Sequence, residues 1–131
     1  MLGVVPFLSV VAGATSYRAA VVQLASTVPD VGVMHASSAS GARVKKANAA
    51  LIDQWATKAA ANGSKIVVFC EEFGSSAQLY SSSTVKYVAE PLPEASGPDG
   101  PSLCGADPSV LPFASTVACT AQRLNLTIVT G

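Results

Sequence analysis

The residues of this chain that could do chemistry gather at Cys70-Glu71-Glu72, at the end of an apolar run. Residues 65–71 (KIVVFCE) predict a strand buried on both faces, and parallel-sheet proteins bind and react where their strands end. A carboxylate at such an edge is a candidate catalytic group, although strand-end acids also serve as solvated groups or caps. Side chains alternate along a strand, so only one of Glu71 and Glu72 can face a cleft if the strand runs that far.

The other reactive side chains are sparse. Of the three cysteines, Cys70, Cys104 and Cys119, one thiol must stay reduced or pair outside the chain. Cys104 falls in a Pro/Gly loop, and Cys119 falls in a predicted helix, where a small buried hydrophobe is expected. His35 has no second His or acidic cluster nearby, so we expect no metal site. No glycine-rich phosphate loop occurs, and we expect no cofactor.

The elements that must position these residues alternate between strand and helix. Residues 17–25 (YRAAVVQLA) predict a first strand. Residues 43–62 place apolar side chains at helical spacing and predict a helix, which Asn62-Gly63 ends. Residues 109–124 predict a second helix, and residues 126–130 (LTIVT) predict a third buried strand.

A strand, a helix and a second strand joined by a short loop form a β-α-β unit, whose strands lie parallel in one sheet. We therefore predict an α/β fold. Residues 85–88 (VKYV) predict a short strand, and residues 91–108 are too rich in Pro and Gly for a regular element. The order β-α-β-loop-α-β stops where a parallel sheet needs another covering helix, so we expect part of a larger domain.

Residues 1–16 predict a signal peptide, which leaves residues 17–131 as one partial domain. The apolar stretch 2–14 is too short to span a bilayer, and Ala12-Gly13-Ala14 supplies the small-x-small pattern of a cleavage site. We therefore expect a secreted protein; the alternative is a buried apolar strand. In a secretory pathway, Asn62 and Asn125 would be candidates for glycosylation, because each begins an N-x-[ST] tripeptide.

The composition excludes several classes of protein. Of 131 residues, 50% are apolar and 12% are charged, and eight basic residues balance eight acidic ones. The apolar fraction is too high for a disordered chain, and the neutral balance lacks the basic footprint of a nucleic-acid binder. We expect one folded domain and no nucleic-acid partner.

Several segments carry a family resemblance when they are taken together and in order. They are YRAAVVQLA, the helix with Ala49-Ala50-Leu51-Ile52 and Ala59-Ala60-Ala61-Asn62-Gly63, and the strand KIVVFCEEFG. This series resembles the start of the carbon–nitrogen hydrolase (nitrilase) superfamily. The signal-like start, the Ser/Pro/Gly-rich excursion and residues 119–129 (CTAQRLNLTIV) look most like its biotinidase and vanin (pantetheinase) branch.

The resemblance implies a four-layer αββα sandwich, a small-molecule amide substrate and a Glu-Lys-Cys triad. Glu71 matches the family's Glu, which takes the proton from the Cys thiol, while the Lys stabilises the negative charge that develops. Cys70 stands where the family commonly has Pro. The family's Lys and Cys follow the third strand, and Lys86, Cys104 and Cys119 match neither motif. The resemblance therefore implies that this chain carries only the base and is inactive alone.

Two functions follow as hypotheses. The first is a secreted amidohydrolase, represented here by its amino-terminal part. The second is a non-catalytic α/β module that binds or associates: either a domain of doubly wound type, or a truncated paralogue that pairs with a full-length partner. Association with a second copy through the sandwich belongs to the same hypothesis.

Overall fold

Strands and helices alternate along the described part of the chain. A computed structural model describes residues 9–10, 17–23, 38–70, 85–94 and 102–130. Its elements, in chain order, are β1 (Ser9–Val10), β2 (Tyr17–Val22), α1 (Ser38–Ala61), β3 (Ser64–Phe69), the short 3-10 helices η2 (Val85–Tyr87) and η3 (Leu103–Gly105), α2 (Pro112–Leu124) and β4 (Thr127–Val129).

The sheet has the order β1-β2-β3-β4. β2 pairs parallel with β3, and β3 pairs parallel with β4, whereas β1 pairs antiparallel with β2. The predicted α/β class, with a β-α-β unit and a third parallel strand, is confirmed at this level. Most of the predicted signal peptide lies outside the described residues; its residues 9–10 form β1.

The end of α1 follows from two residues. The helix stops at Ala61, and the side-chain amide of Asn62 donates a hydrogen bond to the Lys58 carbonyl oxygen, 2.8 Å away. Gly63 then adopts a φ of 79°, a left-handed conformation that glycine enters without a steric penalty. The predicted stop at Asn62-Gly63 is confirmed, although α1 begins five residues earlier than expected.

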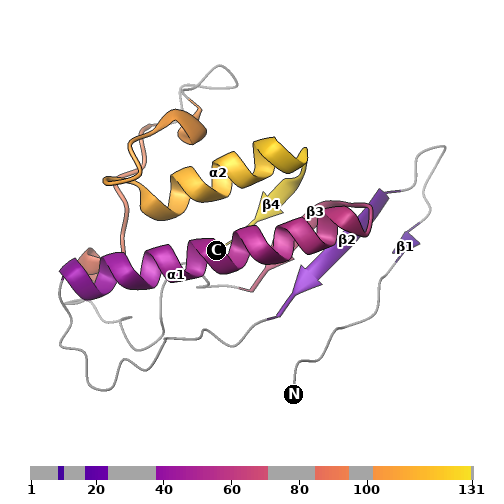
Figure 1. Cartoon of the computed structure of the whole chain (residues 1–131), viewed down its shortest axis with the longest axis horizontal. Helices are drawn as coiled ribbons and strands as arrows, with labels where there is room; N and C mark the ends of the chain where they lie inside the picture. The colour runs from indigo at the N-terminus through magenta and orange to yellow at the C-terminus, as the bar shows by residue number, and fades with distance from the viewer. Residues whose placement is uncertain (1–8, 11–16, 24–37, 71–84, 95–101, 131) are drawn as a thin grey trace.

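Both long helices cover one face of the sheet and run side by side (Figure 1). The core lies between this helical layer and the sheet. Val22, Val67 and Phe69 enter it from the strands, and Ile52 and Ala56 enter it from α1. Trp55, Phe113 and Val117 pack against this cluster and are partly buried.

The opposite face of the sheet is apolar and more exposed. Alternation along the strands and the pairing register place six side chains there in two cross-strand rows, Ala19–Ile66–Thr127 and Val21–Val68–Val129. Val21 is 67% exposed and Val129 is 48% exposed. We call these six residues the open face. The expectation that residues 65–71 form a strand buried on both faces is therefore met only on the helical side.

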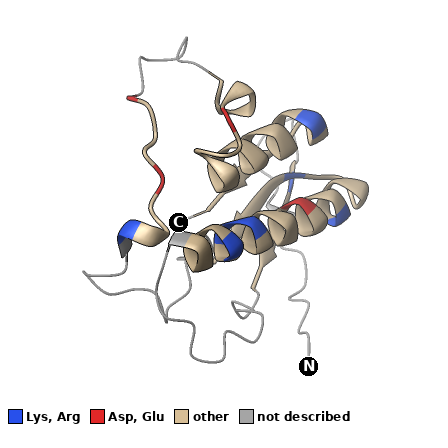
Figure 2. Cartoon of the chain, turned by 60° about the vertical axis from the view of Figure 1, so that its left-hand side comes forward, with Lys and Arg blue, Asp and Glu red and all other residues tan. Residues whose placement is uncertain are grey.

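Charge is concentrated away from the open face. Most Lys, Arg, Asp and Glu of the described segments lie on the helices and connections (Figure 2), and the charged residues of the described strands are Arg18 and Lys65. Both lie near the starts of their strands, outside the two rows. Among the helices that the structure describes, none is long and apolar enough to cross a membrane.

Four predictions about individual elements were wrong. Residues 91–108 do contain a regular element, since η3 lies at Leu103–Gly105, and β4 is exposed at Thr127 and Val129 rather than buried. Residues 85–88 do not form a strand; three of them form η2, because so short an apolar run does not distinguish a strand from a turn. The second helix begins at Pro112 rather than at residue 109, and Val110 is 52% exposed. Proline suits the first helical position, and a turn closed by Asp107 precedes it, since the Val110 and Leu111 amides donate to its carbonyl oxygen.

Candidate functional site

The structure describes only some of the candidate residues that the sequence suggested. Glu71, Glu72 and His35 lie outside the described residues. Cys70 directly follows β3, is partly buried and packs against the core. Asn62 and Asn125 are exposed at the ends of α1 and α2, so both candidate glycosylation positions are on the surface.

A carboxylate that the sequence did not single out holds the start of α2. Residue Leu111 occupies the cap position of this helix and supplies no side-chain hydrogen bond. Glu90 supplies it instead: the Phe113 amide donates to Oε1 at 2.8 Å, and the Ala114 amide donates to Oε2 at 2.9 Å. Backbone N–H groups at a helix start are otherwise unpaired and carry partial positive charge, so a carboxylate there is stabilising.

Glu90 also meets a basic residue of α1. Its Oε1 lies 3.7 Å from Nζ of Lys45, and the two side chains are only 7% and 11% exposed, respectively. This pair joins α1, α2 and the segment 88–92 at one point. Because both oxygens accept backbone hydrogen bonds and the charge is matched by Lys45, Glu90 is suited to anchoring the fold rather than to acting as a base.

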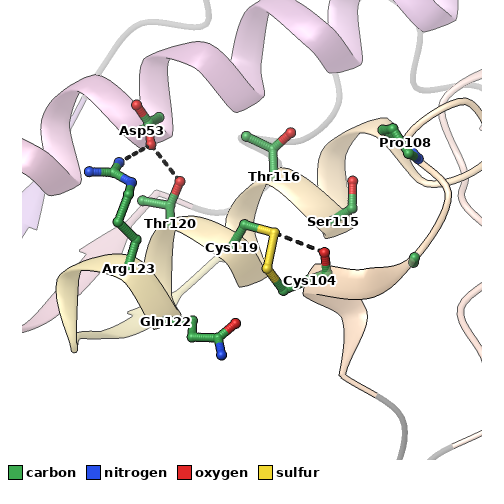
Figure 3. Close-up of a pocket in the computed structure, with 10 residues that line it drawn as sticks. Asp53, Cys104, Pro108, Ser115, Thr116, Cys119, Thr120, Gln122 and Arg123 are labelled. Carbon is green, nitrogen blue, oxygen red and sulfur yellow. Dashed lines mark hydrogen bonds and ion pairs between the residues drawn. A yellow bond between two sulfur atoms is a disulfide. The ribbon is translucent and has the colours of Figure 1, made fainter.

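A second polar cluster joins the two helices in a pocket on their outer side (Figure 3). Oδ1 of Asp53 on α1 accepts hydrogen bonds from the Thr120 hydroxyl at 2.6 Å and from Arg123 Nη2 at 2.5 Å. The pKa of Asp53 lies below its ordinary value, chiefly because Thr120 donates to the carboxylate; partial burial opposes this, and Arg123 favours the charged form. The Asp53–Arg123 pair is about half exposed, and its charges cancel. These contacts hold α1 and α2 together and leave no unmatched charge. We call Asp53, Thr120 and Arg123 the helix clamp.

A disulfide lines the same pocket. Cys104 of η3 and Cys119 of α2 are bonded, with 15 residues of sequence separation, which leaves Cys70 as the reduced thiol. The expectation that Cys119 is a small buried hydrophobe was wrong: the side chain is partly exposed and cross-linked, because η3 lies against α2. Neither sulfur can serve as a thiolate nucleophile in this state.

The remaining candidates that the structure describes do not gather into a site. Lys86 is exposed, and its Nζ lies over the Tyr87 ring, 5.1 Å from the centroid. Within the described ranges, no group of three or more His, Cys, Asp or Glu side chains is placed to hold a metal ion.

Sequence reasoning missed Glu90 because the signal for it is indirect. A helix start with an apolar cap residue needs a partner from elsewhere, but nothing in the spacing tells which acid, here more than twenty residues upstream, provides it. Glu90 also directly precedes a Pro-rich segment, for which the sequence predicts only a loop without a functional residue.

Known proteins supply no further constraint, because the chain matches no protein-family model, no curated protein and no solved structure. The resemblance to carbon–nitrogen hydrolases stays a prediction that rests on the sequence.

Proposed function

We propose that the chain is the amino-terminal part of a carbon–nitrogen hydrolase domain, which cleaves non-peptide amide bonds with Glu71 as general base. The observation that supports this is the parallel β2-α1-β3 unit, whose last strand ends at Phe69, two residues before Glu71. Parallel sheets present catalytic groups where their strands end. The matching Lys and Cys would lie on sequence after residue 131, so the 131 residues alone would be inactive.

The four-layer αββα sandwich belongs to this proposal. Its support is the contrast between the two faces of the sheet, one covered by α1 and α2 and the other apolar and uncharged. A β-branched, uncharged sheet face packs well against another sheet. The second sheet of the sandwich would cover the open face.

Secretion is the third part of the proposal. The Cys104–Cys119 disulfide supports it, because disulfides persist in oxidising compartments. Removal of residues 1–16 as a signal peptide would take β1 away and leave β2 as an edge strand.

The test starts from the native protein of the producing cells, deglycosylated and measured by intact mass. We expect a mass well above the 13.2 kDa of this chain, together with release of amine or ammonia from small linear amides. In the expressed full-length product, Glu71→Gln should lower kcat by about 100-fold or more, the scale of a lost general base. Glu72→Gln is the matched control and should keep most of the activity.

Two outcomes would overturn the hydrolase proposal. The first is a native mass that equals the signal-less chain together with no amide hydrolysis. The second is a full-length product whose activity survives Glu71→Gln.

A second candidate function is an association module without catalysis, and the open face favours it. Sedimentation of the 131-residue chain should then show concentration-dependent self-association, and Val21→Lys should abolish it by burying a charge. Val110→Lys changes a similarly exposed valine outside the sheet and is the matched control. A chain that stays monomeric at high concentration would contradict this function.

A further inference from the structure

The disulfide between Cys104 and Cys119 lines the pocket on the outer side of α1 and α2, together with the helix clamp (Figure 3). Both cysteines are half-buried, and the pocket has a volume of about 560 Å³, which is in the range of small-molecule sites. Thiol–disulfide exchange requires access to a sulfur, and exposed disulfides are the labile ones. A small thiol can therefore approach this cross-link from the pocket while the chain stays folded.

η3 depends on this bond for its place against α2. None of the three residues that the structure describes in η3 is buried. The amides of Gly105 and Ala106 donate to the carbonyl oxygens of Ser102 and Leu103, respectively, so these hydrogen bonds stay within the same turn. A Cβ added at Gly105 would meet no atom within 4 Å. The cross-link therefore holds a lightly packed segment in place.

α2 has other attachments that do not involve the disulfide. Glu90 accepts hydrogen bonds from its first amides, the helix clamp joins it to α1, and Phe113 packs against the core. η3 instead forms the wall of two pockets: Cys104 and Ala106 line the pocket of the helix clamp, and Leu103 lines an apolar pocket beside α2. Opening the disulfide would therefore release η3 and widen both pockets, while α2 keeps its position.

We propose that Cys104–Cys119 is a site of thiol exchange in the folded protein, at which a low-molecular-weight thiol of the glutathione type releases η3 from α2. The thiolate of the small thiol attacks one of the two sulfurs and forms a mixed disulfide with that cysteine. The other cysteine leaves as a thiolate and takes up the proton that the small thiol gave up. A second small thiol then attacks the mixed disulfide, which gives two cysteine thiols and the oxidised dimer of the small thiol. The proposal does not depend on Glu71 or on amide hydrolysis.

The test measures exchange of the folded 131-residue chain with reduced glutathione at neutral pH, stopped by acid and read by peptide mass. Tryptic cleavage after Lys86 places Cys70 in a different peptide from Cys104 and Cys119. The same reaction in concentrated urea gives the rate of the unfolded chain. We expect the folded chain to exchange within about 100-fold of that rate, and the rate to stay constant at urea concentrations below the unfolding transition. Exchange that needs global unfolding would instead be at least about 1,000-fold slower and would rise about five-fold or more per molar urea.

Two further measurements make the test specific. Gln122→Phe, which narrows the pocket, should slow exchange of the folded chain, whereas Gln54→Phe, at an exposed position on α1 outside the pocket, should not. In the ¹⁵N-labelled chain after exchange, the Gly105 and Ala106 amides should lose their folded chemical shifts, while Ala114 keeps its own. The proposal is overturned if the purified chain contains no disulfide, if exchange is more than about 100-fold slower than in the unfolded chain or rises with urea as global unfolding does, if the two glutamine variants behave alike, or if Ala114 loses its folded shift together with η3.

Discussion

Removal of the Glu90 carboxylate is the most informative perturbation of this fold. In Glu90→Ala, the Phe113 and Ala114 amides at the start of α2 lose their acceptor. At the same time Lys45, whose side chain is 11% exposed, keeps a charge without its partner. One substitution therefore affects both helices and the connection between them.

The magnitude can be built from these contacts. Loss of a helix cap costs about 1 kcal/mol. At the Glu90–Lys45 separation of 3.7 Å, the Coulomb energy is about 4 kcal/mol at an effective dielectric constant of about 20. Part of this is offset, because in the variant Lys45 recovers hydration by turning toward water. We therefore expect Glu90→Ala to lower the free energy of unfolding by about 3 kcal/mol, a large share of the 5–15 kcal/mol typical of a domain.

Urea unfolding followed by circular dichroism at neutral pH measures this loss. Glu94→Ala is the matched control, since Glu94 is an exposed acid four residues away and should cost less than about 0.5 kcal/mol. Adding Lys45→Met to Glu90→Ala should recover part of the stability by removing the unpaired buried charge. The reasoning is refuted if Glu90→Ala costs no more than the control, or if the double variant is less stable than Glu90→Ala.

Three further predictions concern the helix clamp, the disulfide and the contact of α1 with η2. The pKa of Asp53 is lower in the folded state than in the unfolded state. Its contribution to the free energy of unfolding is therefore present at pH values above the pKa of the unfolded state, about 4, and is lost as the pH falls through the pKa of the folded state. Asp53→Asn should therefore lose stability at neutral pH and show a shallower decline in acid than the parent; parallel curves of urea midpoint against pH would contradict this. Reduction of the disulfide, which spans 15 residues, should lower the free energy of unfolding by about 3 kcal/mol. Alkylation under denaturing conditions, read by mass, should modify one thiol before reduction and three after it; three before reduction would show that no disulfide is present. Gly41→Ala should destabilise the chain by about 2 kcal/mol despite the higher helix propensity of Ala, because the new Cβ would collide with the Tyr87 carbonyl oxygen. Gly105→Ala adds a Cβ in open space and should be nearly neutral in the same urea unfolding, so equal effects of the two substitutions would contradict the contact.

The elements that the sequence predicted well are those set by local patterns. α1 carries apolar side chains at helical spacing for several turns, and Asn62-Gly63 ends it through the side-chain hydrogen bond of Asn62 and the left-handed conformation of Gly63. Strands β2, β3 and β4 are short apolar runs beside these helices, and their bounds differ from prediction by only a few residues. Apolar spacing and the residues that end a helix or strand are properties of neighbouring positions, so both can be recognised in a single sequence.

The features that the sequence did not predict depend on contacts between distant segments. Glu90 caps a helix that begins more than twenty residues later, and Cys104 pairs with Cys119 only because η3 lies against α2. Likewise, residues 85–88 (VKYV) are too few for their apolar pattern to distinguish a strand from the 3-10 helix that they form. Spacing does not encode such pairings, which arise once the helices have packed.

The apolar run Ile66-Val67-Val68-Phe69 links the local pattern to the function. Such a run predicts a strand covered on both faces, and in the structure α1 and α2 cover Val67 and Phe69, while Ile66 and Val68 are half-buried on the open face. Strands of a sheet with one wet face usually alternate apolar and polar residues, and β3 does not. The composition of β3 therefore favours a second apolar layer over the open face, as both the hydrolase sandwich and the association module require. The two functions differ in which polypeptide supplies that layer, so the native mass and the effect of Val21→Lys on self-association distinguish them.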